Sequence, residues 1–468
     1  MEYADVSNVV FKMDVIFQNT KNRNLLIKLF LFFSPGAFLV LFINAFIFDL
    51  YTPFFSFALF LAIGGAFLRG NTRLFFLLSF FVYVILGHFL AWSYYIDHGN
   101  FFIGGGDDKL FYDYAVDYAQ NGFDRSDPLF VAITFKAYVY VLGGYIDFLN
   151  ILGISTTNYF FDLLLLNNAA GAFGIVTIYQ IVKDRISQDV LFKYCLLIIL
   201  FPTIAYFSAT LLREVYVYLS LTIVALLITN RQYIVFKIVF IGLIVVFVAF
   251  IRTASAILIL SLPLTYFIYS IKKTHIKVIV FFIIFGVLIY LYQEYSGLQD
   301  FDISGKRESY NDLVASEASS DSIGALLKSS NNPIFIAARY IYTLYSPIPP
   351  PIFKKVNLNT TIISIGNFMW YFLLPAYIFS LWNNKIFQNI KINRLMKSFA
   401  LTFLFSVFIV TITSGDPRHL HFLYPFILLG AVQYNFARKH KYNKFLFYYS
   451  IIAVLLVVAY FILKIFIL

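Results

Sequence analysis

Acidic residues are concentrated in one short stretch of an otherwise apolar chain. The sequence "FFIGGGDDKLFYDYAVDYAQNG" (residues 101–122) contains four aspartates, and two of them, Asp107 and Asp108, follow a run of three glycines. A carboxylate near neutral pH can take a proton from a hydroxyl nucleophile. We therefore expect Asp107 or Asp108 to be a catalytic base. The alternative for Asp108 is to cap a helix that begins at Lys109.

Arginine and histidine side chains occur in three further short segments, each next to an apolar run. Arginine presents several donors in one plane, a geometry that suits phosphate groups better than lysine does. Such donors can stabilise an anionic leaving group while an acid elsewhere accepts the proton. The candidate substrate-binding residues are Arg213 and Glu214 in "SATLLREVYVY" (208–218), Arg252 in "FIRTASA" (250–256), and Asp416, Arg418, His419 and His421 in "TSGDPRHLHFLYP" (413–425).

Each candidate also has a purely structural interpretation. Arg213 can extend to lipid headgroups or pair with Glu214, and Arg252 can mark a tight turn. The histidines of the third segment can lie at the membrane interface without a chemical role. Asp113 and Asp117 are four residues apart, so we expect them to form the solvated face of a surface helix.

The composition places the chain among polytopic membrane proteins. Of its 468 residues, 61% are hydrophobic and only 13% are charged, which lies outside the range of soluble domains. The net charge of +11 comes from basic residues scattered over short segments rather than one stripe, so a nucleic-acid partner is not expected. Cys195 is the only cysteine and lies in an apolar run. It cannot form an internal disulfide, and we expect it to be a small core residue.

Apolar runs predict an all-α fold with about 13 transmembrane helices, because a span needs roughly 20 apolar residues. With the N-terminus in the cytoplasm, the basic turns fall on the cytoplasmic side, as the positive-inside rule requires. We expect the whole chain, 1–468, to form a single transmembrane domain. The predicted runs are 24–48, 52–68, 73–95, 159–182, 190–208, 213–229, 232–250, 254–271, 275–292, 361–382, 397–413, 420–436 and 445–466.

Two large segments, 96–158 and 293–360, are then extracytoplasmic. The run 129–149 is assigned to a surface helix, because counting it as a span would place the segment 183–185, with its two basic residues, on the outer side. All cytoplasmic loops are short, too short to hold a domain that binds a nucleotide-activated donor. The four charged segments face the outer side, where a donor attached to a membrane lipid can reach them.

Three segments resemble motifs of a known protein family. They are "GGGDDKLFYDYA" (104–115), "NNAAGAFGIVTIYQIVKDRISQDV" (167–190) and "LFPTIAYFSATLLREVYVYLSL" (200–221). They resemble the acidic first-loop motif and the following helix pair of the GT-C superfamily of integral-membrane glycosyltransferases, in particular its family 39-like members. The resemblance implies a GT-C-like fold with Asp107 or Asp108 as the catalytic acid. The turns within 248–260 and 417–431 resemble those where such proteins hold the lipid phosphate or the sugar.

The chain also resembles O-antigen and capsule polysaccharide polymerases of the Wzy type. It shares their richness in Phe, Ile, Tyr and Asn, their outer-face arginines and their large late outer loop. Both resemblances imply a bacterial inner-membrane enzyme in polysaccharide biosynthesis. Its donor would be a saccharide linked to polyprenyl phosphate or diphosphate, and its acceptor a glycan. Repeat-unit polymerase and single-sugar transferase both remain open.

Functions of other classes remain as alternatives. A flippase or transporter of lipid-linked oligosaccharide also needs arginines for a diphosphate, but it needs polar groups along the whole path, whereas these charges gather on one face. A structural partner without chemistry would tolerate alanine at Asp107 and Asp108. No cofactor is certain. The aspartate pair leaves room for a divalent cation, although two adjacent carboxylates are weak evidence of a metal site.

Overall fold

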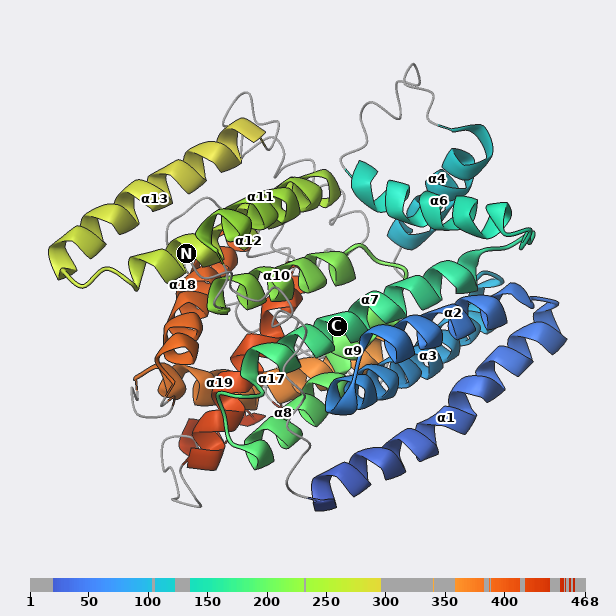
Figure 1. Cartoon of the computed structure of the whole chain (residues 1–468), viewed down its shortest axis with the longest axis horizontal. Helices are drawn as coiled ribbons and strands as arrows, with labels where there is room; N and C mark the ends of the chain where they lie inside the picture. The colour runs from blue at the N-terminus through green and yellow to red at the C-terminus, as the bar shows by residue number, and fades with distance from the viewer. Residues whose placement is uncertain are drawn as a thin grey trace, which may run out of the picture.

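The structure, a computed structural model, describes most of the chain. It covers residues 20–102, 106–122, 135–230, 233–295, 358–382, 389–412 and 417–437, with residues 340 and 387 and a few positions between 447 and 458. All regular structure within these ranges is helical (Figure 1), which confirms the predicted all-α class. The expected outer segment 293–360 lies almost wholly outside the described residues.

The described helices occur in the following order along the chain. The first part of the chain forms α1 (Thr20–Phe48), α2 (Thr52–Phe67), α3 (Gly70–His98), α4 (Asp107–Asn121), α6 (Lys136–Ile151) and α7 (Phe160–Val182). The middle forms α8 (Gln188–Leu200), α9 (Pro202–Ser208), α10 (Glu214–Thr229), α11 (Ile234–Ile251), α12 (Thr253–Ile268) and α13 (Thr274–Tyr295). The last part forms α17 (Leu358–Trp382), α18 (Ile390–Ile412), the 3₁₀ helix η2 (Pro417–Leu423) and α19 (Tyr424–Ala437).

Several of these helices are long and apolar enough to cross a bilayer. Among the described residues there are six, within α1, α3, α7, α11, α17 and α18, and a seventh if the bent pair α8–α9 is one span. The chain is therefore a helical, multi-pass membrane protein, while the predicted number of about 13 spans stays a prediction. The run 190–208, predicted as one span, is bent by 57° between α8 and α9. Pro202, the first residue of α9, lacks the N–H that would continue the helix.

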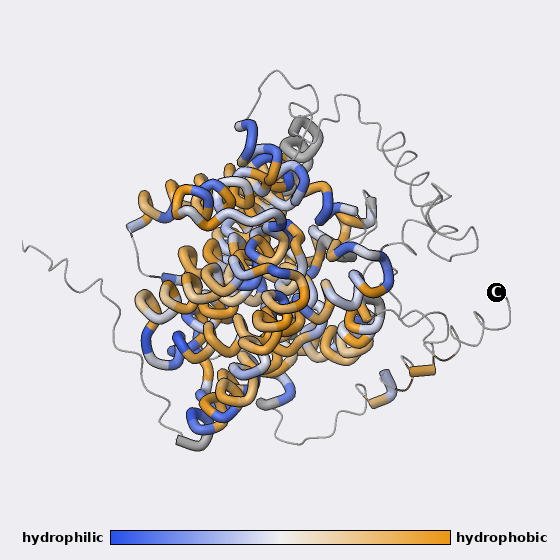
Figure 2. Tube along the Cα trace, turned by 90° about the vertical axis from the view of Figure 1, so that its right-hand side faces the viewer, coloured by the Kyte–Doolittle hydropathy of each residue, from blue (hydrophilic) through white to orange (hydrophobic). Residues whose placement is uncertain are grey.

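Lipid-facing and protein-facing helices differ in burial. Figure 2 views the helices nearly end on and shows apolar residues over most of the described trace, with polar residues mainly at its turns. The apolar side chains of α1 and α11 are largely exposed, for example Phe46 at 78% and Ile234 at 71%. In contrast, α7 is buried along almost its whole length. The core therefore forms around α7, and we infer that α1 and α11 face lipid.

The basic turns meet at one end of α10. Its 16 residues make it about 24 Å long. Where it ends, Arg185 and Lys391 both donate to the carbonyl oxygen of Thr229, each at 3.1 Å. Cations at the C-terminus of a helix satisfy carbonyls that lack a helical partner and complement the helix dipole. Basic residues from 183–185 and from the start of α18 thus gather at one end, as the charge pattern predicts.

The opposite end carries α4 and α6. The two helices pack together, and α6 also contacts α7 and α11 (Figure 1). The inner side of α6 is buried, with Tyr138 and Leu142 at 0%, while Tyr140 is 42% exposed. Its 16 residues span about 24 Å, less than the roughly 30 Å core of a bilayer. Residues 129–134 of the predicted surface run lie outside the described part, and its place at the membrane surface stays a prediction.

Substitutions at two neighbouring glycines of α6 can test the contact between α4 and α6. A Cβ on Gly143 would meet the ring of Tyr118 and lie 3.0 Å from the carbonyl oxygen of Ala115, whereas one on Gly144 would meet nothing within 4 Å. We expect Gly143→Ala to lower the free energy of unfolding by about 1–3 kcal/mol through overpacking. Gly144→Ala should raise it by about 0.5–1 kcal/mol, because alanine favours a helix. Denaturant unfolding in detergent measures both, and equal effects would contradict the packing described.

The orientation of the bundle can be tested with single cysteines. Cys195 is buried, so the natural chain should react little with a maleimide. Asp113 lies exposed on α4, and Lys273 lies exposed in the turn before α13. If the basic end is cytoplasmic, a membrane-impermeant maleimide should label Asp113→Cys in spheroplasts with an intact inner membrane, and Lys273→Cys only after permeabilisation. The opposite pattern would reverse the predicted topology.

Candidate functional site

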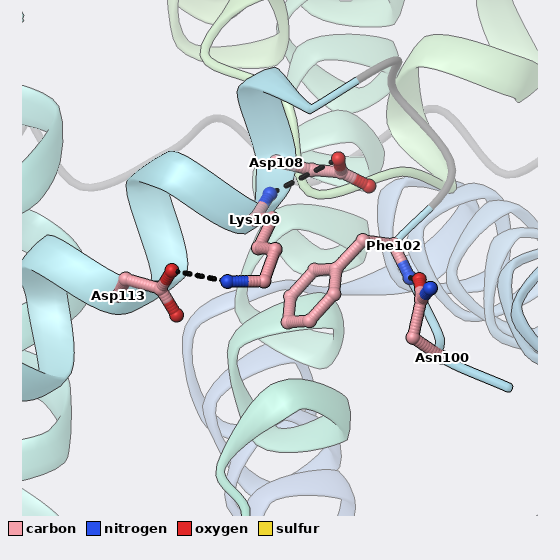
Figure 3. Close-up of polar contacts among 5 residues, drawn as sticks. All are labelled: Asn100, Phe102, Asp108, Lys109 and Asp113. Atoms are coloured by element: carbon pink, nitrogen blue, oxygen red, sulfur yellow. Dashed lines mark hydrogen bonds and ion pairs between the residues drawn. The ribbon is translucent and has the colours of Figure 1, made fainter.

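The acidic motif forms the first turn of α4. The helix begins at Asp107, two residues earlier than the capping alternative assumes, and Gly106 precedes it with φ 101°, a conformation that favours glycine. Asp108 is 1% exposed, whereas Asp107 is half-buried. The Oδ1 atom of Asp108 accepts the N–H of Lys109 at 3.0 Å (Figure 3). Asp108 thus satisfies one first-turn donor, but it lies inside the helix and is buried.

The other aspartates of the motif face solvent. Asp113 accepts from the Nζ of Lys109 at 2.7 Å, and both side chains are more than half exposed. Asp117 accepts from Asn121 one turn later at 2.8 Å. Figure 3 shows the carboxylates of Asp108 and Asp113 on different sides of α4. The predicted solvated face is therefore confirmed, and Asp108 is the aspartate that turns inward.

Tyr138 on α6 lies between the acidic helix and α10. Its ring is 5.0 Å from that of Phe111, one turn after Asp108, and 5.5 Å from that of Tyr216. Burial, the largest cause, raises the pKa of Tyr138 well above its usual value, and the charges of Tyr216, Glu214 and Asp108 act in the same direction. The phenol of Tyr138 is therefore neutral, and two carboxylates that are far apart in the sequence, Asp108 and Glu214, both act on it electrostatically.

Arg213 lies against the same aromatic side chain that follows Asp108. It is in the connection between α9 and α10, and its guanidinium carbon is 5.5 Å from the ring centre of Phe111 and 5.7 Å from that of Phe135. One nitrogen of Arg213 donates to the carbonyl oxygen of Ile251 at 3.2 Å. Stacking on aromatic rings holds a guanidinium in place while keeping its charge. Arg213 therefore stacks on a ring that lies one turn after Asp108 on α4.

Glu214 pairs with Arg252 rather than with its neighbour Arg213. The Nη1 atom of Arg252 is 3.5 Å from Oε1 of Glu214, and the two side chains are 17% and 6% exposed. Arg252 has extended backbone between α11 and α12, so it also marks the tight turn that the sequence suggests. The local pair of Arg213 with Glu214, one of the sequence alternatives, is thus replaced by a pair between two helix junctions.

The fourth predicted segment is described only in part. Asp416 lies outside the described residues, as do the side chains of Arg418 and His419, although the backbone of η2 packs against α9 and α10. His421 is 4% exposed, with its ring centre 4.1 Å from that of Phe207 on α9. The structure therefore brings His421 to the helix that precedes Arg213. It leaves the other three predictions open.

Asn167 on α7 is a site residue that the sequence analysis missed. It is fully buried, and its amide nitrogen donates to the carbonyl oxygens of Thr210 and Leu212 and to the hydroxyl of Tyr138 at 2.9, 3.1 and 3.0 Å. The signal was present in the sequence as two consecutive asparagines inside an apolar run.

As for metals, no group of three or more His, Cys, Asp or Glu side chains in the described ranges could hold an ion.

Comparisons of the chain with protein-family models, curated proteins and solved structures find no match. The resemblance to GT-C glycosyltransferases and Wzy-type polymerases therefore stays a prediction from the sequence. The chemistry of the site has to be argued from its own groups. These are the buried carboxylate of Asp108, the phenol of Tyr138, and the guanidinium groups of Arg213 and Arg252 at one end of the bundle.

The pair of Glu214 and Arg252 can be tested by a double-mutant cycle. Glu214→Gln and Arg252→Gln each leave a largely buried charge without its partner, so each should lower the free energy of unfolding. The double variant should recover about 1–3 kcal/mol relative to the sum of the single effects. Denaturant unfolding in detergent gives the four values. The exposed pair of Lys109 and Asp113 is the control, with an expected coupling of about 0.5 kcal/mol, and strict additivity at Glu214 and Arg252 would rule out the pair.

Proposed function

We propose that the protein is a bacterial inner-membrane glycosyltransferase that uses saccharides linked to polyprenyl phosphate or diphosphate at the extracytoplasmic face. It serves the assembly of a surface polysaccharide, as a repeat-unit polymerase or as a single-sugar transferase. One observation carries the proposal. Asp108 is buried on α4 one turn before Phe111, and Arg213 stacks on the ring of Phe111, with the pair of Arg252 and Glu214 next to Arg213 in sequence and structure.

These groups supply both halves of a glycosyl transfer. Asp108 takes the proton of the acceptor hydroxyl as its oxygen forms a bond to the anomeric carbon of the donor. The bond between that carbon and the phosphate oxygen breaks, and the electron pair leaves with the phosphate or diphosphate. Arg213 and Arg252 stabilise the charge that develops on this leaving group. Glu214 holds Arg252 in place, a more specific role than the direct substrate contact expected from the sequence.

The position of the site supports a lipid-linked donor. Asp108, Arg213 and Arg252 lie at the end of the bundle opposite the basic groups around Thr229, and the positive-inside rule assigns that basic end to the cytoplasm. Nucleotide-activated sugars are cytoplasmic, so they do not reach the outer end. A donor whose tail remains in the bilayer presents its head group there. The half-buried rings of Phe102 and of Tyr112 on α4, with centres 5.3 Å apart, suit contact with a sugar face.

Mass spectrometry of lipid-linked saccharides from cells with and without the gene tests the proposal. A polymerase predicts that complete single repeat units accumulate on the polyprenyl carrier in the deletion strain, with only one unit displayed at the surface. A single-sugar transferase predicts a repeat that lacks one residue. A flippase predicts complete units that stay on the cytoplasmic side, shielded from an enzyme added to spheroplasts. An unchanged set of lipid-linked saccharides would refute the proposal.

Replacement of the buried carboxylate should abolish transfer while the protein still folds. We expect Asp108→Asn to lower the rate about 10²–10⁴-fold, the range typical of a lost general base. When it is expressed in the deletion strain, this variant should not restore the wild-type set of lipid-linked saccharides. Asp113→Asn is the matched control, because Asp113 lies on the same helix but faces solvent, and it should restore the wild-type profile. Asp107→Asn decides between the two predicted bases, and full loss there with activity retained at Asp108→Asn would assign the role to Asp107.

A further inference from the structure

The connection between α9 and α10 is unwound and buried. Residues 209–213 separate the end of α9 at Ser208 from the start of α10 at Glu214. Ala209 and Thr210 are 0% exposed, Leu211 is 1% and Leu212 is 3% exposed. Backbone carbonyls in such a place need hydrogen-bond donors, because neither a helix nor water supplies them. The connection therefore depends on side chains of other helices.

Two consecutive asparagines of α7 provide these donors. Asn167 donates to the carbonyl oxygens of Thr210 and Leu212 at 2.9 and 3.1 Å. The side-chain amide of Asn168 faces two acceptors, the carbonyl oxygens of Ser208 and of Leu164 in its own helix; with its nitrogen assigned to that side, it donates to both at 3.0 Å. Together they hold the connection at Ser208, Thr210 and Leu212, directly before Arg213.

Glycines allow the connection to approach its neighbours closely. A Cβ on Gly87 of α3 would lie 2.8 Å from the carbonyl oxygen of Ala209, and one on Gly171 of α7 would lie 2.6 Å from the Cβ of Ser208. Both distances are too short for an ordinary carbon contact. The connection is therefore fixed by hydrogen bonds on one side and by close packing on two helices.

Asn167 also reaches the acidic half of the site. Its amide nitrogen is 3.0 Å from the hydroxyl of Tyr138, whose ring packs on Phe111 and Tyr216. One buried side chain thus contacts both the segment that ends at Arg213 and the helix that packs on α4. Movement of Asn167 would change the position of Arg213 relative to Asp108.

We infer that Asn167 is a positioning residue of the site, which fixes Arg213 and Tyr138 relative to each other so that the acid and the arginine act on one substrate. The inference rests on the proposed function, because it assigns a role within that same site. Asn167 touches no reacting atom. Its effect passes through the backbone carbonyls of Thr210 and Leu212 and through the hydroxyl of Tyr138.

Hydrogen exchange of the full chain in detergent, followed by mass spectrometry, tests the structural half of the inference. Asn167→Leu keeps approximately the shape of the side chain but removes its donors. Exchange in the segment 209–216 should become about tenfold faster, because opening no longer breaks these hydrogen bonds. Asn44→Leu is the control, since Asn44 is equally buried but bonds to Trp92 at the contact of α1 and α3. If Asn167→Leu does not fold, Asn167→Ser, which keeps one donor, should give a smaller change in the same direction.

The functional half is measured by transfer to the glycan acceptor in membranes. Asn167→Leu should reduce transfer at least about tenfold more than Asn44→Leu at a matched loss of thermal stability, because misplaced groups slow the reaction. An unchanged exchange rate in 209–216 would overturn the inference, as would equal transfer by the two variants. If Asn167→Leu transfers normally while Asp108→Asn is inactive, the inference about Asn167 is overturned and the proposed function is not. Normal transfer by Asp108→Asn removes the proposed role of Asp108 and, with it, the role assigned here to Asn167.

Discussion

The backbone between α9 and α10 has to be hydrogen-bonded although it is neither helical nor exposed. This constraint organises the site, because Asn167 and Asn168 satisfy it from α7, and α7 is the most deeply buried helix of the bundle. A continuous helix through 202–229 would satisfy its own carbonyls and would leave Arg213 on a regular helix face. The break instead turns Arg213 toward Phe111. The asparagines thus permit a conformation that the site needs and that an apolar core alone would not tolerate.

The two ends of α10 have different electrostatic roles. At its start, Glu214 is paired with Arg252, and Arg213 is stacked over aromatic rings. At its end, Arg185 and Lys391 satisfy the carbonyl of Thr229. The first end holds charges of both signs close together in a largely buried setting, whereas cations supply the interactions at the second. Charges of both signs suit chemistry on an anionic, lipid-linked molecule, while basic groups alone suit orientation in the membrane.

Much of this arrangement could be predicted from sequence, because it depends on local composition. Apolar runs predict the helices, basic turns predict which ends come together, and the spacing of Asp113 and Asp117 predicts their solvated face. The missed contacts of the site depend on partners distant in the sequence. Glu214 pairs with a residue 38 positions away rather than its neighbour, and Asn167 bonds to carbonyls more than 40 residues away. No periodicity encodes such pairs, although two asparagines in an apolar run indicate that some buried polar group needs them. The bend after α8 has a local signal, Pro202, which the sequence analysis did not use.

The contact between Glu214 and Arg252 bears on how an anion can enter the site. At 3.5 Å it is longer than the 2.7–2.9 Å of a tight charge-assisted hydrogen bond. A guanidinium carries five N–H donors, more than one carboxylate oxygen can use. Glu214 can therefore neutralise Arg252 before the donor arrives, which reduces the penalty of keeping that charge largely buried. Under the proposed function, the carboxylate of Glu214 would keep Arg252 in position and Asp108 would accept the proton, so the two acids would have separate roles.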